Sequence, residues 1–226
     1  MTARISTGLF HRRGDATYIF VQGESMLCAR VGIVNELIAG RQCAVELGKP
    51  VLARQAFDHG TLPFVICRDG AWHYRGSVIG RKELVCLFSS VLKRDAEGAY
   101  LLETPAERGV IRVEDAPFVA VELGWAGVGL DQVLTFRTNV DQVVTAGPKH
   151  PIRVAFDARS CEPTPYVHVR DGLGAFPLEA RIGRAVYYEL VALAEPCVVD
   201  GRAVLGVWSS GCFFPLGALP EDGRDS

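Results

Sequence analysis

Hydrophobic positions recur along the chain with two periods, and these predict where helices and strands lie. Between Arg81 and Arg94 the apolar residues follow the i, i+3, i+4, i+7 spacing of one helix face. A second segment, with an apolar stripe from Val186 to Ala194, has similar spacing. The pattern therefore predicts two amphipathic helices, and the shorter alternating segments between them predict strands.

Glycine, proline and aspartate separate the predicted strands. Asp69-Gly70 lies between two apolar segments and supplies the positive φ values of a type I′ turn, so residues 62–75 are predicted to form a β-hairpin. Asp200-Gly201 predicts a second hairpin near the C-terminus. The other predicted strands are 99–103, 110–114, 117–125, 132–139, 152–156, 204–209 and 212–216.

One stretch of sequence occurs twice, about a hundred residues apart. Residues 65–70 (Val-Ile-Cys-Arg-Asp-Gly) precede Ile-Gly-Arg and the first helix, and residues 167–172 (Val-His-Val-Arg-Asp-Gly) precede Ile-Gly-Arg and the second. We interpret this as a duplicated strand–turn–strand–helix unit. The expected fold class is α+β, with mainly antiparallel sheets, two amphipathic helices and two subdomains.

Four parts of the chain are predicted. Residues 1–45 form a poorly defined N-terminal extension with a candidate helix at 25–39, and Met26 raises the hypothesis that the true start lies downstream of Met1. The first and second α+β subdomains are expected at 46–126 and 127–220. The charged tail is 221–226.

Composition excludes several classes of function. With a net charge of −2 and a pI near 6.2, the chain lacks the basic footprint of a nucleic-acid binder. No apolar run approaches the ~20 residues that a membrane helix requires. The 7 cysteines have no C-x-x-C spacing, and two of them lie in apolar strand and helix patterns. We expect a cytoplasmic protein without membrane insertion, because reduced cysteines are typical of that compartment.

The sequence signatures of common enzymes and cofactor sites are missing. Gly48-Lys49 is followed by Pro50, so no phosphate-binding P-loop is present, and the glycines at 124, 127 and 129 do not make a dinucleotide fingerprint. The 5 histidines are scattered without metal-ligand spacing. Ser209-Ser210 lacks the G-x-S-x-G context of a hydrolase nucleophile. We therefore expect no metal and no cofactor, and catalysis is the least favoured function.

Three predicted strands each place an arginine beside other hydrogen-bonding groups on one face, since residues two apart in a strand point the same way. If these faces converge, they would form a site for a phosphate or carboxylate, with an aromatic ring for stacking. The candidate ligand-binding residues are Arg112 and Glu114, Arg137 and Asn139, Tyr166, His168 and Arg170, and Trp208.

The alternative is that these residues are a solvated face. An antiparallel sheet usually has one such face, and Arg–Glu pairs across it are common, so the residues alone favour this interpretation. His168 would then be a hydrogen-bonded structural residue. Glu114 and Asp115 are adjacent, and adjacent strand residues point to opposite faces, which argues against a catalytic dyad. Asp115 is expected to organise a turn before Pro117.

From about residue 58 to 217 the chain resembles the bacterial family called domain of unknown function 1285. The resemblance implies a two-domain α+β fold with repeated motifs, whose second part is loosely similar to pleckstrin-homology-like barrels. A nucleotide-like ligand in the groove between the domains, and a role in signal transduction, have been suggested for the family. Residues 1–45 depart from the shorter helical lead-in of the family. The segments that carry the resemblance are Arg68-Asp-Gly-Ala-Trp72, Ile79-Gly-Arg81, Leu87-Phe-Ser-Ser90, Ile111-Arg-Val-Glu-Asp-Ala-Pro-Phe118, Leu134-Thr-Phe-Arg-Thr-Asn139, Pro165-Tyr-Val-His-Val-Arg170 and Gly206-Val-Trp-Ser-Ser-Gly211.

Two function hypotheses follow. The first is a non-enzymatic binding protein, such as a sensor, for an anionic, nucleotide-like small molecule. The alternative is a protein–protein interaction module, in which the aromatic run of Trp208, Phe213 and Phe214 forms part of a docking surface. Strict alternation would expose one of the two phenylalanines. A serine- or histidine-centred enzyme is the weakest interpretation.

Overall fold

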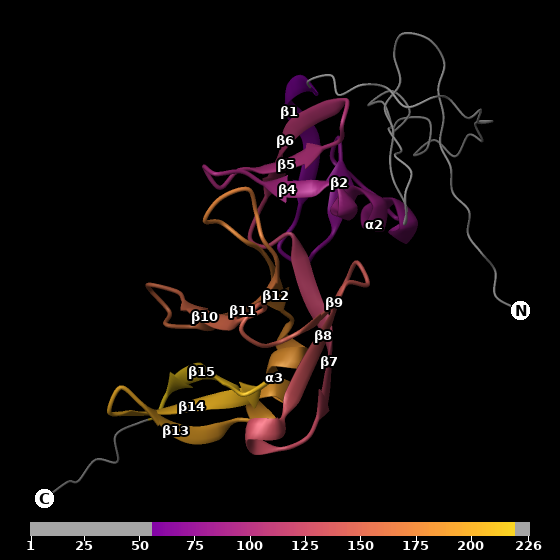
Figure 1. Ribbon diagram of the computed structural model, residues 1–226. Coiled ribbons are helices and arrows are strands. Elements are labelled where there is room, and N and C mark those ends of the chain that lie inside the picture. Colours follow the sequence, from indigo (N-terminus) through magenta and orange to yellow (C-terminus); the bar gives the residue numbers. More distant parts are fainter. Residues whose placement is uncertain (1–55, 220–226) are drawn as a thin grey trace, which may run out of the picture. The chain divides into compact units, whose positions relative to one another are not determined.

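The computed structural model describes residues 56–219 (Figure 1). The predicted extension 1–45, with its candidate helix and the alternative start, lies outside the described residues, as does the tail 221–226. The described chain forms two compact units. The first contains the residues up to Val65 and Trp72–Arg112, and the second contains Ile66–Ala71 together with the chain from Val113 onward.

The first unit is a six-stranded sheet with one helix. Its strand order is β3-β2-β1-β6-β5-β4. The core is aromatic, because Phe64 packs against both Tyr74 and Phe88, at 4.7 and 5.1 Å between ring centroids. The elements are β1 (Phe57–Ile66), β2 (Trp72–Tyr74), β3 (Ser77–Val78), α2 (Lys82–Ser90), β4 (Leu92–Arg94), β5 (Tyr100–Glu103) and β6 (Glu107–Val113).

The first predicted helix is present but ends earlier than expected. α2 stops at Ser90, and Leu92, which the helical spacing included, is 2% exposed as the first residue of β4 and pairs with Leu102. The Ser89 and Ser90 hydroxyls donate to the carbonyls of Cys86 and Leu87 within the last turn. Tertiary pairing with β5 therefore determines the end of the helix.

The turn at Asp69-Gly70 forms as a hairpin, but the type I′ prediction is wrong. Gly70 has φ +84°, whereas Asp69 is not among the described residues with positive φ, and type I′ requires both. The Gly70 N–H donates to the Cys67 carbonyl, and the Asp69 carboxylate accepts the Ala71 N–H. At Asp200-Gly201 both φ values are positive, 51° and 75°, which confirms the other predicted hairpin.

The second unit contains a six-stranded sheet, a three-stranded sheet and one helix. The larger sheet has the order β10-β11-β12-β7-β8-β9, and the smaller has the order β13-β14-β15. All pairs are antiparallel except β12 with β7. The elements are β7 (Phe118–Ala126), the 3-10 helix η1 (Gly129–Asp131), β8 (Val133–Thr138), β9 (Val143–Thr145), β10 (Ile152–Phe156), β11 (Pro163–Arg170), β12 (Leu178–Ile182), α3 (Arg184–Ala192), β13 (Glu195–Val199), β14 (Arg202–Ser209) and β15 (Cys212–Ala218).

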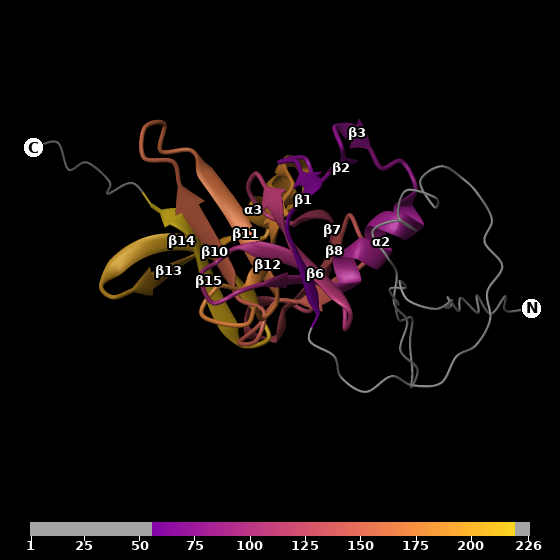
Figure 2. The ribbon, with the colours of Figure 1, turned by 90° about the horizontal axis from the view of Figure 1, so that it is seen from above.

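One face of the larger sheet forms the core of this unit. Ile152, Val167, Ala180 and Phe118 lie in one cross-strand row and are at most 4% exposed. α3 packs against β7 and β14, and β15 lies beside β10 (Figure 2). The opposite face of the sheet carries the polar side chains, as the alternation predicts.

The expected α+β class with mainly antiparallel sheets is confirmed. The structure is mostly sheet, and its described part holds the two helices expected from the sequence. Neither helix, nor any other in residues 56–219, is long and apolar enough to span a membrane. Both copies of the repeated sequence end in a nine-residue helix. The two copies differ at the turn, because Gly70 has a positive φ and Gly172 does not. Duplication of the unit therefore stays a prediction.

Candidate functional site

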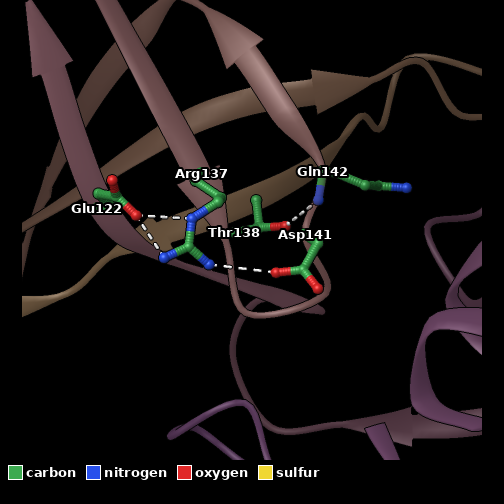
Figure 3. A network of polar contacts seen from close by, with 5 residues as sticks. All are labelled: Glu122, Arg137, Thr138, Asp141 and Gln142. Carbon is green, nitrogen blue, oxygen red and sulfur yellow. Dashed lines mark hydrogen bonds and ion pairs between the residues drawn. The ribbon is translucent and has the colours of Figure 1, made fainter. Parts of the chain in front are cut away.

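Arg137, on β8, is held by two carboxylates (Figure 3). Its Nε donates to Glu122 Oε2 at 2.6 Å, and its Nη1 donates to Asp141 Oδ1 at 3.1 Å. Glu122 is the cross-strand partner of Arg137, and its hydrogen bond is the main cause that raises the pKa of the guanidinium. These contacts are those of a solvent-facing ion pair, as the alternative interpretation of the polar face supposes.

Asn139 holds a turn in place. Its side-chain oxygen accepts the Val119 N–H at 3.0 Å, and its Nδ2 donates to the Gly70 carbonyl at 3.1 Å. All three residues belong to the second unit. The amide therefore joins the 66–71 turn to β7, and the contact is a structural one.

Arg170 and His168 lie near the end of β11, where a register shift separates them, and they have different partners. The Arg170 guanidinium lies 5.4 Å from the centroid of the Phe118 ring, and burial lowers its pKa. His168 Nε2 lies 3.1 Å from Asp171 Oδ1. Its Nδ1 is buried and has no hydrogen-bond partner among the described residues. The His150 ring packs against the His168 ring, with 5.5 Å between the two ring centroids.

The remaining predicted residues lie on other elements. Arg112 is exposed on β6 in the first unit. Glu114, just after β6, accepts the backbone N–H of Arg68 at 3.2 Å. Trp208 belongs to the smaller sheet and packs on Phe213 at 5.1 Å. Within the larger sheet, β12 and β7 separate β11 from β8, so Arg137 and Tyr166 share a face without being neighbours.

Tyr166 is the predicted residue that lies in a dense polar arrangement. It forms a cross-strand row with Arg153 on β10 and Arg181 on β12. The Tyr166 hydroxyl donates to Asp115 Oδ1 at 2.7 Å. The Arg153 guanidinium lies 4.3 Å above the centre of the Tyr166 ring, a cation–π geometry. We call Arg68, Asp115, Arg153, Tyr166 and Arg181 the tyrosine cluster, and all five belong to the second unit.

Two arginines of the tyrosine cluster are only loosely paired. Asp115 Oδ2 lies 3.8 Å from Arg68 Nε and 3.7 Å from Arg181 Nε, which exceeds hydrogen-bond length. The Arg68 side chain is 71% exposed, the Arg181 side chain 33%. Within residues 56–219, neither guanidinium donates a hydrogen bond to the protein. Both therefore retain donors for a bound group.

Arg153 is different, because its charge is already balanced. It donates two hydrogen bonds to Glu179, at 2.6 and 2.5 Å, and these are the main cause that raises its pKa. Such a bidentate pair is strong and specific in orientation. Arg153 thus fixes the Tyr166 ring, while Arg68 and Arg181 share Asp115. A further carboxylate, Asp157, lies near enough for Arg68 to help lower its pKa, after the N–H groups of Ser160 and Arg159.

The protonation state of Tyr166 limits the chemistry of the cluster. Burial, together with the hydrogen bond to Asp115, raises the pKa of Tyr166 to about 12. The phenol therefore stays neutral at physiological pH and donates a hydrogen bond to Asp115 rather than acting as a base or nucleophile. The cluster is suited to binding through the planar donors of its arginines.

The high pKa of Tyr166 predicts a specific alkaline titration. At pH 10.5 the folded protein and a Tyr166→Phe variant should show equal tyrosinate absorbance at 295 nm, because Tyr166 is still neutral. After unfolding in guanidinium, the absorbance of the wild type should exceed that of the variant by about three quarters of one tyrosinate, because the unfolded pKa is about 10. The group ionises earlier in the unfolded chain, so its contribution to stability is present below pH 10 and is lost as the pH rises toward 12. Unequal absorbance in the folded state would contradict the buried hydrogen bond.

The strand pattern predicted only Tyr166 of the five residues of the tyrosine cluster. The alternation in residues 152–156 does place Arg153 opposite Ile152, and Arg68 lies in the repeated motif, so the sequence carries a signal for both. Asp115 connects Arg68 to Tyr166, because its carboxylate pairs with Arg68 and accepts a hydrogen bond from the Tyr166 hydroxyl. The sequence suggested Asp115 only as a residue that organises a turn. No set of three or more His, Cys, Asp or Glu side chains suited to a metal occurs in the described part of the chain.

The fold and the cluster define a two-unit α+β protein with an arginine-bearing polar face. The chain belongs to the DUF1285 family, as its motifs suggested. Residues 49–116 match the family model described as "Domain of unknown function (DUF1285), N-terminal domain", and residues 117–216 match "Protein of unknown function (DUF1285), C-terminal domain". No protein with curated annotation matches the chain at a significant level.

Two solved structures of DUF1285 family proteins are similar to the chain. The one from Silicibacter pomeroyi DSS-3 shares 44% identity at a TM-score of 0.65, and the match covers 78% of this chain and 92% of that one. The one from Shewanella baltica OS155 shares 24% identity at a TM-score of 0.43, over 58% and 91% of the two chains.

Proposed function

We propose that the protein binds a small anionic molecule between Arg68 and Arg181 of the tyrosine cluster. The observation that supports this proposal is the loose pairing of both guanidiniums with Asp115, at 3.8 and 3.7 Å. Arginine presents planar donors that match phosphate and carboxylate groups, and a bidentate contact is stronger than the pairs seen here.

The surroundings of the two arginines support a binding role rather than catalysis. Tyr166 is neutral and committed to Asp115, and Arg153 is committed to Glu179. These contacts hold the cluster in one geometry, which reduces the ordering that a ligand would have to induce. Of the eight ligand-binding residues predicted from sequence, we place Tyr166 in this site.

Several finer features belong to the same proposal. A nucleotide-like ligand and a signalling role, which the family resemblance implies, suit paired arginines because phosphate is a strong acceptor for them. A pleckstrin-homology-like second half, duplication of the strand–turn–strand–helix unit and a cytoplasmic location are likewise proposals.

Substitution of the two arginines tests the site. Arg181→Ala should weaken binding of inorganic pyrophosphate at least tenfold in isothermal titration calorimetry, and Arg68→Ala should do the same. The control is Arg202→Ala, which removes an exposed arginine of the same unit from β14 and should leave binding unchanged. Loss of binding in Arg137→Ala but not in Arg181→Ala would instead place the site on β8, and no binding by the wild type would contradict the proposal.

An interaction module is the second candidate, favoured by the aromatic side chains of the smaller sheet. Phe214 is 7% exposed, and its neighbour Phe213 is half-buried against Trp208, so neither is exposed as strict alternation would require. A protein partner could dock on this aromatic pair. Capture of a stoichiometric partner by the wild type but not by Trp208→Ala, with capture intact in Arg181→Ala, would favour this function over anion binding.

A further inference from the structure

We infer that the Asp115 carboxylate occupies the position that the bound anion takes, so that the site selects ligands with at least two negative charges. This inference rests on the proposed function and names the class of ligand. Asp115 Oδ2 faces Arg68 Nε and Arg181 Nε at similar distances, 3.8 and 3.7 Å. A ligand oxygen that lies between these two Nε atoms would enter the same space.

The carboxylate is held in place by its other oxygen. Tyr166 donates to Asp115 Oδ1 at 2.7 Å, and the ring of Tyr166 lies under the Arg153 guanidinium. The Asp115 side chain is 14% exposed, and the next residue, Ala116, is 4% exposed. Asp115 is therefore a fixed competitor rather than a mobile surface charge.

Competition from a fixed carboxylate decides which anions bind. A singly charged anion such as chloride or acetate would replace one negative charge with another, so it would gain little by displacing Asp115. A ligand with two or more negative charges and several oxygens can contact both guanidiniums bidentately. These contacts are stronger than the ion pairs with Asp115 that the ligand displaces. Phosphate monoesters, pyrophosphate and dicarboxylates have this chemistry.

The neighbouring charges support the same selectivity. Glu179 neutralises Arg153, and Glu114 contacts the backbone of Arg68. Asp157 adds a third carboxylate near Arg68. The two available arginines thus lie among carboxylates that repel weakly bound anions, and a net gain requires a ligand of high charge density.

The test is the isosteric substitution Asp115→Asn, with inorganic phosphate, pyrophosphate and acetate as probes at fixed ionic strength. Binding of phosphate and pyrophosphate should tighten at least fivefold. Acetate, for which the inference predicts no measurable binding to the wild type, should begin to compete. Asp171→Asn is the control, because it removes the same charge from a side chain that is 95% exposed and outside the cluster. It should change each affinity less than twofold.

The outcomes separate the inference from the proposed function. Weaker pyrophosphate binding by Asp115→Asn, with binding by the wild type intact, would overturn the inference and make Asp115 a direct contact to the ligand, while the anion site would stand. Absence of pyrophosphate binding in the wild type and in both variants would overturn both. If Asp115→Asn does not fold, Tyr166→Phe provides the readout, since it releases Oδ1 of Asp115. Phosphate binding should then tighten about twofold, and a decrease would count against the inference.

Discussion

Replacing Gly70 by alanine is expected to lower the free energy of unfolding by about 3 kcal/mol, the sum of backbone strain and of two weakened hydrogen bonds. Gly70 has φ +84°, a conformation that costs an alanine about 1–2 kcal/mol. An added Cβ would also lie 2.6 Å from Asn139 Nδ2 and 2.9 Å from Val119 Cγ2. Asn139 would have to move, which disturbs its bonds to Gly70 and Val119. Urea unfolding followed by tryptophan fluorescence measures the change.

Gly201→Ala is the matched control for this prediction. Gly201 lies in the same unit and has a similar φ of +75°. Apart from Gly201 and its two chain neighbours, no residue of the described chain has a heavy atom within 4 Å of the position of its Cβ. This variant should lose only the strain energy, about 1 kcal/mol. Equal losses in the two variants would mean that the contact with Asn139 contributes nothing to stability.

The two Asp-Gly pairs show how far local sequence determines a turn. At Asp200-Gly201 the flanking strands β13 and β14 pair directly, and the predicted turn forms. At Asp69-Gly70 the same dipeptide forms another turn, because Gly70 is held by Asn139, which lies 69 residues further along the chain. A contact of that range has no signature in a six-residue pattern. The type of a short element was predictable here, but its detailed geometry was not.

The polar face of β11 illustrates the same limit at the candidate site. Alternation correctly separates Tyr166 from Val167 and Val169, which are 0% and 6% exposed on the core face. The partners of Tyr166 depend on strand order, since Arg153 and Arg181 come from the neighbouring strands β10 and β12. Asp115 reaches the Tyr166 hydroxyl across 51 residues of sequence. A single sequence contains the residues of the cluster but not the pairing that assembles them.

Ser209→Ala should lower the free energy of unfolding by about 2 kcal/mol, the cost of a buried donor left without a partner. Ser209 is 0% exposed, and its hydroxyl accepts the Leu134 N–H at 2.9 Å and donates to the Ala146 carbonyl at 2.8 Å. Alanine would leave the Leu134 N–H unpaired in the core. The Ala146 carbonyl would keep the hydrogen bond from Ser210, at 2.9 Å.

Ser210→Ala separates this structural role from a catalytic one. The Ser210 side chain is exposed, and its loss leaves Ala146 bonded to Ser209, so stability should change by less than about 0.5 kcal/mol. A fluorophosphonate probe should not label Ser209 in the folded protein, because a buried hydroxyl with two hydrogen bonds is inaccessible to it. Stoichiometric labelling at Ser209, together with an unchanged unfolding midpoint for Ser209→Ala, would return this serine to the list of candidate nucleophiles. Destabilisation without labelling would mean that the hydroxyl joins β14 to β8 and to the chain after β9, as its two partners indicate.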